Sequence, residues 1–151
     1  MAKAYKKGAA VLMTERTQNP TMQVPAWIKG FAREMLGCDC ADAVFEHIEY
    51  FPETEVGDFP GLVRRIVIGN RLLIFIWESE DLTEVETHLP LLLNAGIKER
   101  DDRRLNRFRL VIGTTDAEGI KSVMDAWDPV SSGRDPKAHL HIIRKEDIPR
   151  G

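Results

Sequence analysis

The chain has 151 residues, of which 43% are hydrophobic and 30% are charged, and its formal net charge is −3. This length matches one ordinary domain, and the apolar fraction is too high for a disordered chain. The near balance of charge excludes a general binder of nucleic acid or anionic lipid. The longest apolar run, 72–77, is far shorter than the roughly 20 residues that span a bilayer.

The first 22 residues lack the signals of a folded element. They contain Lys3, Lys6 and Lys7 but no periodic apolar pattern, so we expect a flexible N-terminal arm over residues 1–22. The apolar stretch after these lysines is shorter than the roughly 7 to 15 residues of a signal peptide core. We therefore expect a cytosolic protein with a single α/β domain over residues 23–151.

Apolar residues first repeat at helical spacing after Pro25. One stripe contains Trp27, Ile28, Phe31, Ala32, Met35 and Leu36. The spacing predicts a helix that begins at Pro25 and ends at Gly37. A helical turn over 41–45, a strand over 47–51 and a loop over 52–61 are expected next.

Two further strands complete a predicted meander. Residues 62–68 are rich in β-formers, and Gly69-Asn70 suits a two-residue hairpin turn. Residues 72–77 are apolar at every position, which is typical of a strand buried on both faces. We therefore expect 72–77 to be the innermost strand of the three.

A capping-box pattern, Thr83-x-x-Glu86, predicts the start of the next helix. Pro90 indicates either a kink or a new start near Leu89, and Asn94-Ala95-Gly96 predicts the end of the helix. The charged stretch that follows, 98–107, is expected to be a solvated helix extension or a long loop.

Strands and helices alternate in the last third of the chain. A strand over 108–112, a helix capped by Asp116 and a strand over 139–143 are predicted. Parallel neighbours need crossover connections, so this ending predicts a partly parallel sheet. The predicted fold class is α/β (or α+β): a three-strand meander followed by strand–helix–strand–helix–strand, with helices flanking a mixed sheet.

Charge is segregated along the chain. Residues 39–58 hold seven acidic side chains and no lysine or arginine, whereas residues 98–109 hold six basic side chains and three acidic ones. Such runs are either solvated faces that oppose each other within one molecule or a docking site for a partner. In the second case the expected contact residues are Arg100, Arg103 and Arg104.

The most distinctive short motif is Cys38-Asp39-Cys40. Thiols near a helix N-terminus have a lowered pKa, so the pair indicates a thiol-redox role or half of a soft-metal site; the alternative is two small core residues. His139 and His141 alternate on a predicted strand, so their imidazoles share a face. Two thiolates and two imidazoles make a tetrahedral zinc set, so Cys38, Cys40, His139 and His141 are the candidate ligands, with two surface histidines as the simpler alternative.

The order helix, three-strand meander, helix, strand over residues 26–112 resembles the core of the restriction-endonuclease-like superfamily. This resemblance implies a Mg²⁺ site that includes Asp58 and Glu78, with Glu34 from the first helix as a further candidate. Members of that superfamily carry an acidic-x-Lys pair on the third strand, whereas this strand ends in Glu78-Ser79-Glu80.

The motifs of nucleotide-binding loops and of the serine nucleophile elbow are absent from the sequence. We therefore predict a small non-catalytic binding or accessory protein whose partner is another protein or a second copy of the chain. The alternative is a Cys-x-Cys thiol-redox or metal-handling protein, and a lesser alternative is a degenerate restriction-endonuclease-like fold. No cofactor is expected apart from zinc or another soft metal in the alternative case.

Overall fold

The computed structural model describes residues 24–129 and 132–149, so the arm predicted over residues 1–22 lies outside the described residues. A five-stranded mixed sheet in the order β1-β2-β3-β4-β5 forms the centre of the fold. The first three strands are an antiparallel meander, and the last two run parallel to β3. The strands are β1 (Ile48–Thr54), β2 (Val63–Ile68), β3 (Leu72–Glu78), β4 (Arg107–Thr114) and β5 (Ala138–Arg144).

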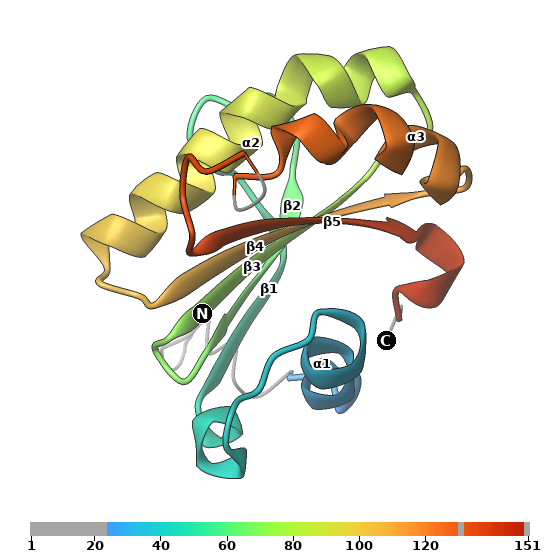
Figure 1. Cartoon of the computed structure of the whole chain (residues 1–151). Helices are drawn as coiled ribbons and strands as arrows, with labels where there is room; N and C mark the ends of the chain where they lie inside the picture. The colour runs from blue at the N-terminus through green and yellow to red at the C-terminus, as the bar shows by residue number, and fades with distance from the viewer. Residues whose placement is uncertain (1–23, 130–131, 150–151) are drawn as a thin grey trace, which may run out of the picture.

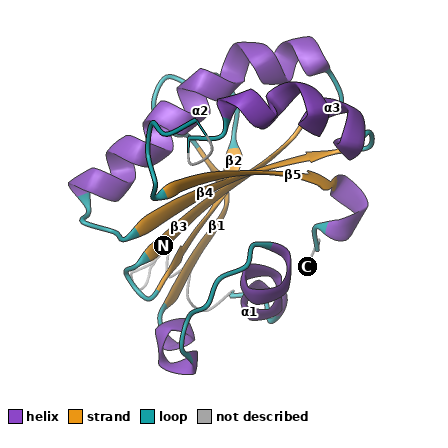
Figure 2. Ribbon diagram, viewed as in Figure 1, coloured by secondary structure: helices purple, strands orange, loops and turns teal. Residues whose placement is uncertain are grey.

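Helices cover both faces of this sheet, which confirms the predicted fold class (Figures 1 and 2). The crossover helices α2 (Leu82–Asp102) and α3 (Ala117–Met124) lie on one face. On the other face lies α1 (Trp27–Gly30), which continues as a π-helical turn over Phe31–Met35. Short 3₁₀ turns occupy Asp42–Glu46, Asp125–Trp127 and Lys145–Asp147. None of the described helices is long and apolar enough to cross a membrane.

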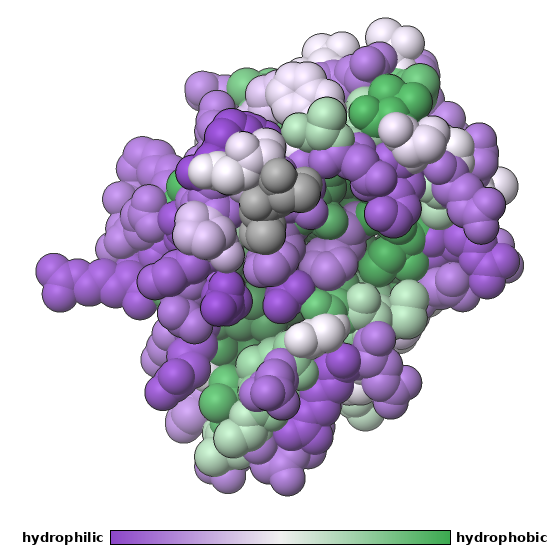
Figure 3. Space-filling model, in the orientation of Figure 1, coloured by the Kyte–Doolittle hydropathy of each residue, from purple (hydrophilic) through white to green (hydrophobic). Residues whose placement is uncertain are grey.

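The alternation of side chains along β4 separates two cores. Phe108, Leu110 and Ile112 pack in the core under α2 and α3, whereas Val111 packs in the core under α1. Successive side chains of a strand point to opposite faces, so Arg107 and Arg109 share the α1 face with Val111. The space-filling view shows a hollow with apolar side chains between α1 and β5 on this side of the molecule (Figure 3).

The turn and the central strand of the meander agree with the sequence-based predictions. Gly69 and Asn70 both have positive φ, +61° and +53°, as a tight two-residue hairpin turn requires. β3 has two strands on each side and is buried from Leu72 to Ile76, which confirms its central position. The first helix also ends as predicted, because Gly37 has a φ of +73°.

The predicted bounds of α2 are wrong at both ends. The N-cap is Asp81, whose carboxylate accepts a hydrogen bond from the Thr83 N–H at 2.8 Å, so Thr83 is not the cap. The helix also does not end at Gly96 but continues to Asp102, with Pro90 inside it, so the first half of 98–107 is the helix extension that the sequence left open as one alternative. A Cβ atom at Gly96 would overlap the ring of Phe108 on β4. Gly96 therefore permits close packing between helix and sheet rather than helix termination.

The loop predicted over 52–61 is wrong at its start, because β1 continues through Pro52 to Thr54. β1 is an edge strand, so one side of it has no partner strand. A proline, which lacks an N–H, is tolerated at such a position because the sheet need not lose a hydrogen bond there. The pairing with β2 shifts register between Phe51 and Thr54, as expected of a bulge beside a proline.

Candidate functional site

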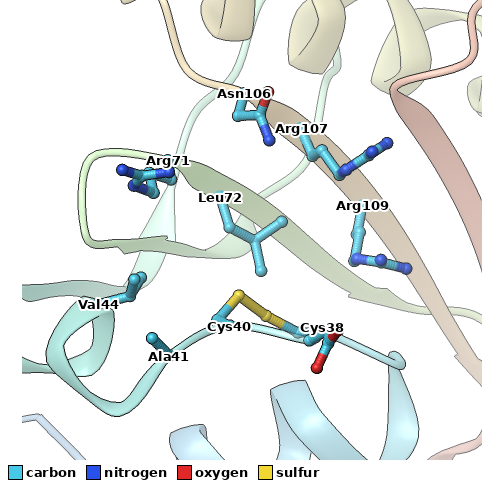
Figure 4. A pocket seen from close by; sticks show the side chains of 10 residues that line it. Cys38, Cys40, Ala41, Val44, Arg71, Leu72, Asn106, Arg107 and Arg109 are labelled. Atoms are coloured by element: carbon cyan, nitrogen blue, oxygen red, sulfur yellow. A yellow bond between two sulfur atoms is a disulfide. The ribbon is translucent and has the colours of Figure 1, made fainter.

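A pocket of about 360 Å³ opens on the α1 face of the sheet. Figure 4 shows Arg107 and Arg109 on one side of it, Arg71 on the opposite side and Leu72 between them. The N–H groups of Asn106 and Arg107 donate to the Arg71 carbonyl at 2.7 and 3.0 Å, which holds the β2–β3 hairpin against the start of β4. A volume of this size lies in the range of small-molecule sites.

The opposite wall of the pocket is the loop that follows the first helix. The positive φ of Gly37 turns the chain, and the Cys38 N–H donates to the Ala32 carbonyl at 2.9 Å. Cys38 and Cys40 form a disulfide within this loop, and both residues line the pocket (Figure 4). The wall is therefore a short covalent ring, closed over the start of β3 and β4.

The lining of the pocket is strongly basic, with three guanidinium groups against the single carboxylate of Asp39. Arg109 is the most deeply placed of the three, at 9% exposure. Its Nη1 donates to Nε2 of His141 at 3.0 Å, and its Nε–H has no acceptor among the described residues. Arg107 donates to the Pro136 carbonyl at 3.3 Å, and Arg71 is exposed.

Burial and neighbouring positive charge lower the pKa values of Arg109 and of the two histidines on β5. Burial, followed by repulsion from Arg107, lowers the pKa of Arg109 below its ordinary value. Burial, followed by repulsion from Arg109, lowers the pKa of His141 to about 4. His141 is therefore neutral at pH 7, and its Nε2 carries the lone pair that accepts from Arg109. Burial likewise lowers the pKa of His139.

The four candidate metal ligands lie on the same face of the sheet as two separate pairs. Cys38 and Cys40 are joined in the disulfide, and the rings of His139 and His141 stack with centroids 6.3 Å apart. Arg109 links the two pairs, because it lines the pocket with the cysteines and bonds to His141. Across the described ranges, no group of three or more His, Cys, Asp or Glu side chains is placed to hold a metal ion.

The three arginines expected at a partner surface have different environments. Arg100 is buried and forms two hydrogen bonds with Asp135, at 2.9 and 2.8 Å, so it is engaged within the fold. Arg103 lies 3.5 Å from Glu49, which agrees with acidic and basic segments that oppose each other within one molecule. Arg104 is exposed.

The acidic residues implied by the endonuclease resemblance are not assembled into one site. The element order on which the resemblance rests is present. Glu78 extends the β3 side chains that face α1 and pairs with Arg64 at 3.0 Å. Asp58 lies in a loop whose Phe59 packs on the opposite side, in the core under α2. Glu34 is exposed on the π-helical turn.

Two other hollows in the described part of the chain are weaker candidates for a binding site. One of about 460 Å³ has an acidic rim and is lined by Val24, Glu46, His47, Ile48, Glu49, Val67 and Asn70. One of about 210 Å³ lies between the π-helical turn, α3 and β5, beside His141. No arginine lines either hollow, so the pocket at Arg109 is the strongest candidate site.

Two of the three pocket arginines, Arg107 and Arg109, belong to the predicted basic segment 98–109 but were not among the expected contact residues, and Arg71 was not predicted at all. A signal for Arg109 is present in the sequence, because it interrupts the apolar strand Phe108–Ile112 at a position where a charge is costly. Arg71 carries no such signal, since it lies beside a hairpin turn where exposed charges are ordinary.

Comparisons with protein-family models, with curated proteins and with solved structures found no match to this chain. The fold and the site define a mixed α/β protein with an arginine-lined pocket.

Proposed function

We propose that this protein binds a small anionic ligand in the pocket lined by Arg71, Arg107 and Arg109. The observation that supports this most strongly is the buried guanidinium of Arg109, which has no carboxylate partner among the described residues. Burying a charge without a counter-ion costs several kcal/mol, so a fold that keeps one is expected to use it. A bound anion would supply both the opposite charge and an acceptor for the free Nε–H.

The rest of the lining indicates the kind of anion. Guanidinium groups match the geometry of phosphate and carboxylate oxygens, and two further arginines adjoin Arg109. Leu72, Val44 and the disulfide provide an apolar wall beside them. This combination favours a small organic phosphate, sulfonate or carboxylate over a bare inorganic ion.

A binding role is favoured over a hydrolytic one. The lining contains arginines, one aspartate and an asparagine, but no histidine, lysine, serine or threonine among the described residues. The nearest imidazole, His141, has a pKa of about 4 and accepts from Arg109, so it is already engaged. The proposal therefore keeps the non-catalytic binding module expected from the sequence and specifies its ligand class.

The test is a titration of the full chain with inorganic phosphate and with succinate at constant ionic strength, followed by NMR. We expect saturable shifts of the Arg109 Nε–H and of the backbone amides of Asn106 and Arg107. Arg109→Met is expected to weaken binding by at least tenfold, because a charge-assisted hydrogen bond contributes about 1.5–3 kcal/mol. Arg71→Gln, at an exposed position, is expected to weaken it only about two- to threefold.

Arg104→Gln is the matched control. It removes one positive charge from the same basic segment, but Arg104 is exposed and does not line the pocket. We expect less than a twofold change in affinity for this variant. The proposal is wrong if neither anion shifts the Arg109 resonance, or if Arg109→Met and Arg104→Gln weaken binding equally.

A further inference from the structure

The disulfide in the pocket wall lies where a bound anion would touch it. Cys38 and Cys40 line the same pocket as the three arginines, and the disulfide lies beside Leu72 in the close view (Figure 4). Cys38 is 8% exposed, whereas Cys40 is only partly buried. Cys40 is therefore the sulfur more open to a molecule that enters the pocket.

Thiol–disulfide exchange is the reaction that such a bond undergoes. A thiolate attacks one sulfur, and the other sulfur leaves as a thiolate, so both the attacking and the leaving group are anions. Neighbouring guanidinium groups attract anionic reactants and favour the thiolate form of cysteine. The lining of this pocket thus favours the exchange at both stages, and more so for a thiol that carries a further negative charge.

We propose that the pocket carries out thiol–disulfide exchange with small thiols that bear a carboxylate, sulfonate or phosphate group. This inference rests on the proposed anion binding, and it identifies the ligand as a reactant of the Cys38–Cys40 disulfide. The arginines hold the charged end of the thiol, which places its sulfur against the wall formed by the loop. No metal is required.

The exchange takes place in two steps. The thiolate of the first small thiol attacks Sγ of Cys40, a mixed disulfide forms, and Sγ of Cys38 leaves with the electron pair of the broken S–S bond. A second thiolate attacks the small-molecule sulfur of the mixed disulfide, and Sγ of Cys40 leaves as a thiolate. Two small thiols are oxidised to their disulfide, the protein disulfide is reduced to two thiols, and the two protons pass through solvent to the cysteines.

Three thiols that differ only in their end group test this inference. The oxidised full chain is incubated with 2-mercaptoethanesulfonate, 2-mercaptoethanol or cysteamine, quenched with iodoacetamide, and analysed by mass spectrometry. Rates are expressed per thiolate, which removes differences in ionised fraction, and the rate of each thiol with the urea-unfolded chain serves as the reference for its intrinsic nucleophilicity. We expect the anionic thiol to react about tenfold faster than the neutral one, and the cationic thiol to be the slowest. Added salt is expected to reduce the difference.

Variants and the unfolded chain separate this inference from the proposed function. The preference for the anionic thiol is expected to be lost in Arg109→Met and in urea, where the pocket is absent, and to persist in Arg104→Gln. Equal rates for the three thiols in the folded protein, or two free thiols in the freshly purified chain under air, overturn the exchange while phosphate binding stands. If phosphate does not bind either, the proposed function fails together with this inference.

Discussion

Among the described residues, each side of the sheet buries one arginine, and the two arginines differ in their partners. Arg100, near the end of α2, is 7% exposed and forms two hydrogen bonds with Asp135. Arg109, on β4, is 9% exposed, and the side chain that it contacts is the neutral imidazole of His141. The hydrogen bond with Asp135 raises the pKa of Arg100, whereas burial lowers that of Arg109.

This difference separates a structural arginine from a binding one. Both guanidinium groups have lost most of their water, but only the charge of Arg100 is neutralised within the fold. Burial therefore does not identify a site; the nature of the partner does. We therefore expect the loss of Arg100 and the loss of Arg109 to change stability in opposite directions.

The largest effect is expected for Arg100→Met. This change leaves Asp135 as an unpaired carboxylate with a side chain that is only 17% exposed. We expect the free energy of unfolding to fall by about 3 kcal/mol, the low end for breaking a buried ion pair, as measured by urea denaturation. Phosphate affinity is expected to be unchanged, because Arg100 does not line the pocket. A loss below about 1 kcal/mol would contradict the structural role.

The second effect concerns pH and His141. The unfolded chain protonates this histidine near its ordinary pKa of 6.5, but in the fold the pKa is about 4 because of burial and the charges of Arg109, His139 and Lys121. The stabilisation is therefore fully present above pH 6.5 and is lost as the pH falls toward 4. We expect the loss of stability between pH 7 and pH 4, measured by urea denaturation, to be about 3 kcal/mol smaller in His141→Gln than in the unmodified protein. NMR titration of His141 with a pKa near 6.5 in the folded protein would contradict it.

The smallest effect has the opposite sign. Arg109→Met removes a buried charge that has no counter-ion, and its linear side chain fills much of the same space. We expect the free energy of unfolding to rise by about 1 kcal/mol, even though anion binding is weakened. Phosphate at ten times its dissociation constant is expected to add about 1.4 kcal/mol to the unmodified protein and at most about 0.4 kcal/mol to this variant, whose binding is at least tenfold weaker. Destabilisation by Arg109→Met would place Arg109 with Arg100 as a structural residue.

Local patterns were sufficient for much of the fold. The Gly69-Asn70 turn, the buried run at 72–77 and the Asp116 cap depend on residues only a few positions apart, and the structure has all three. The alternation of strands and helices from residue 72 onward was likewise enough to predict a partly parallel sheet, because parallel neighbours need crossovers.

Gly96 shows where local patterns fail. The sequence Asn94-Ala95-Gly96 is compatible both with a glycine that ends a helix and with a glycine that packs against another element. Its actual role is set by the Phe108 ring of β4, which packs where a Cβ atom would lie. The same holds for Pro52, which is tolerated within a strand only because that strand lies at the sheet edge.

The composition and periodicity of the chain were enough to predict a mixed α/β fold, and its charge pattern identified one acidic segment, 39–58, and one basic segment, 98–109. The pocket could not be found in this way, because its walls come from residues 38–44, 71–72 and 106–109, which are brought together by strand pairing and by the loop after the first helix. Whether an arginine on a strand is neutralised depends on which side chains the neighbouring strand presents at that register. For Arg109, strand β5 presents His139 at the paired position and, two residues further on, the neutral His141 that accepts its hydrogen bond, so the register of β4 against β5 decides its partner.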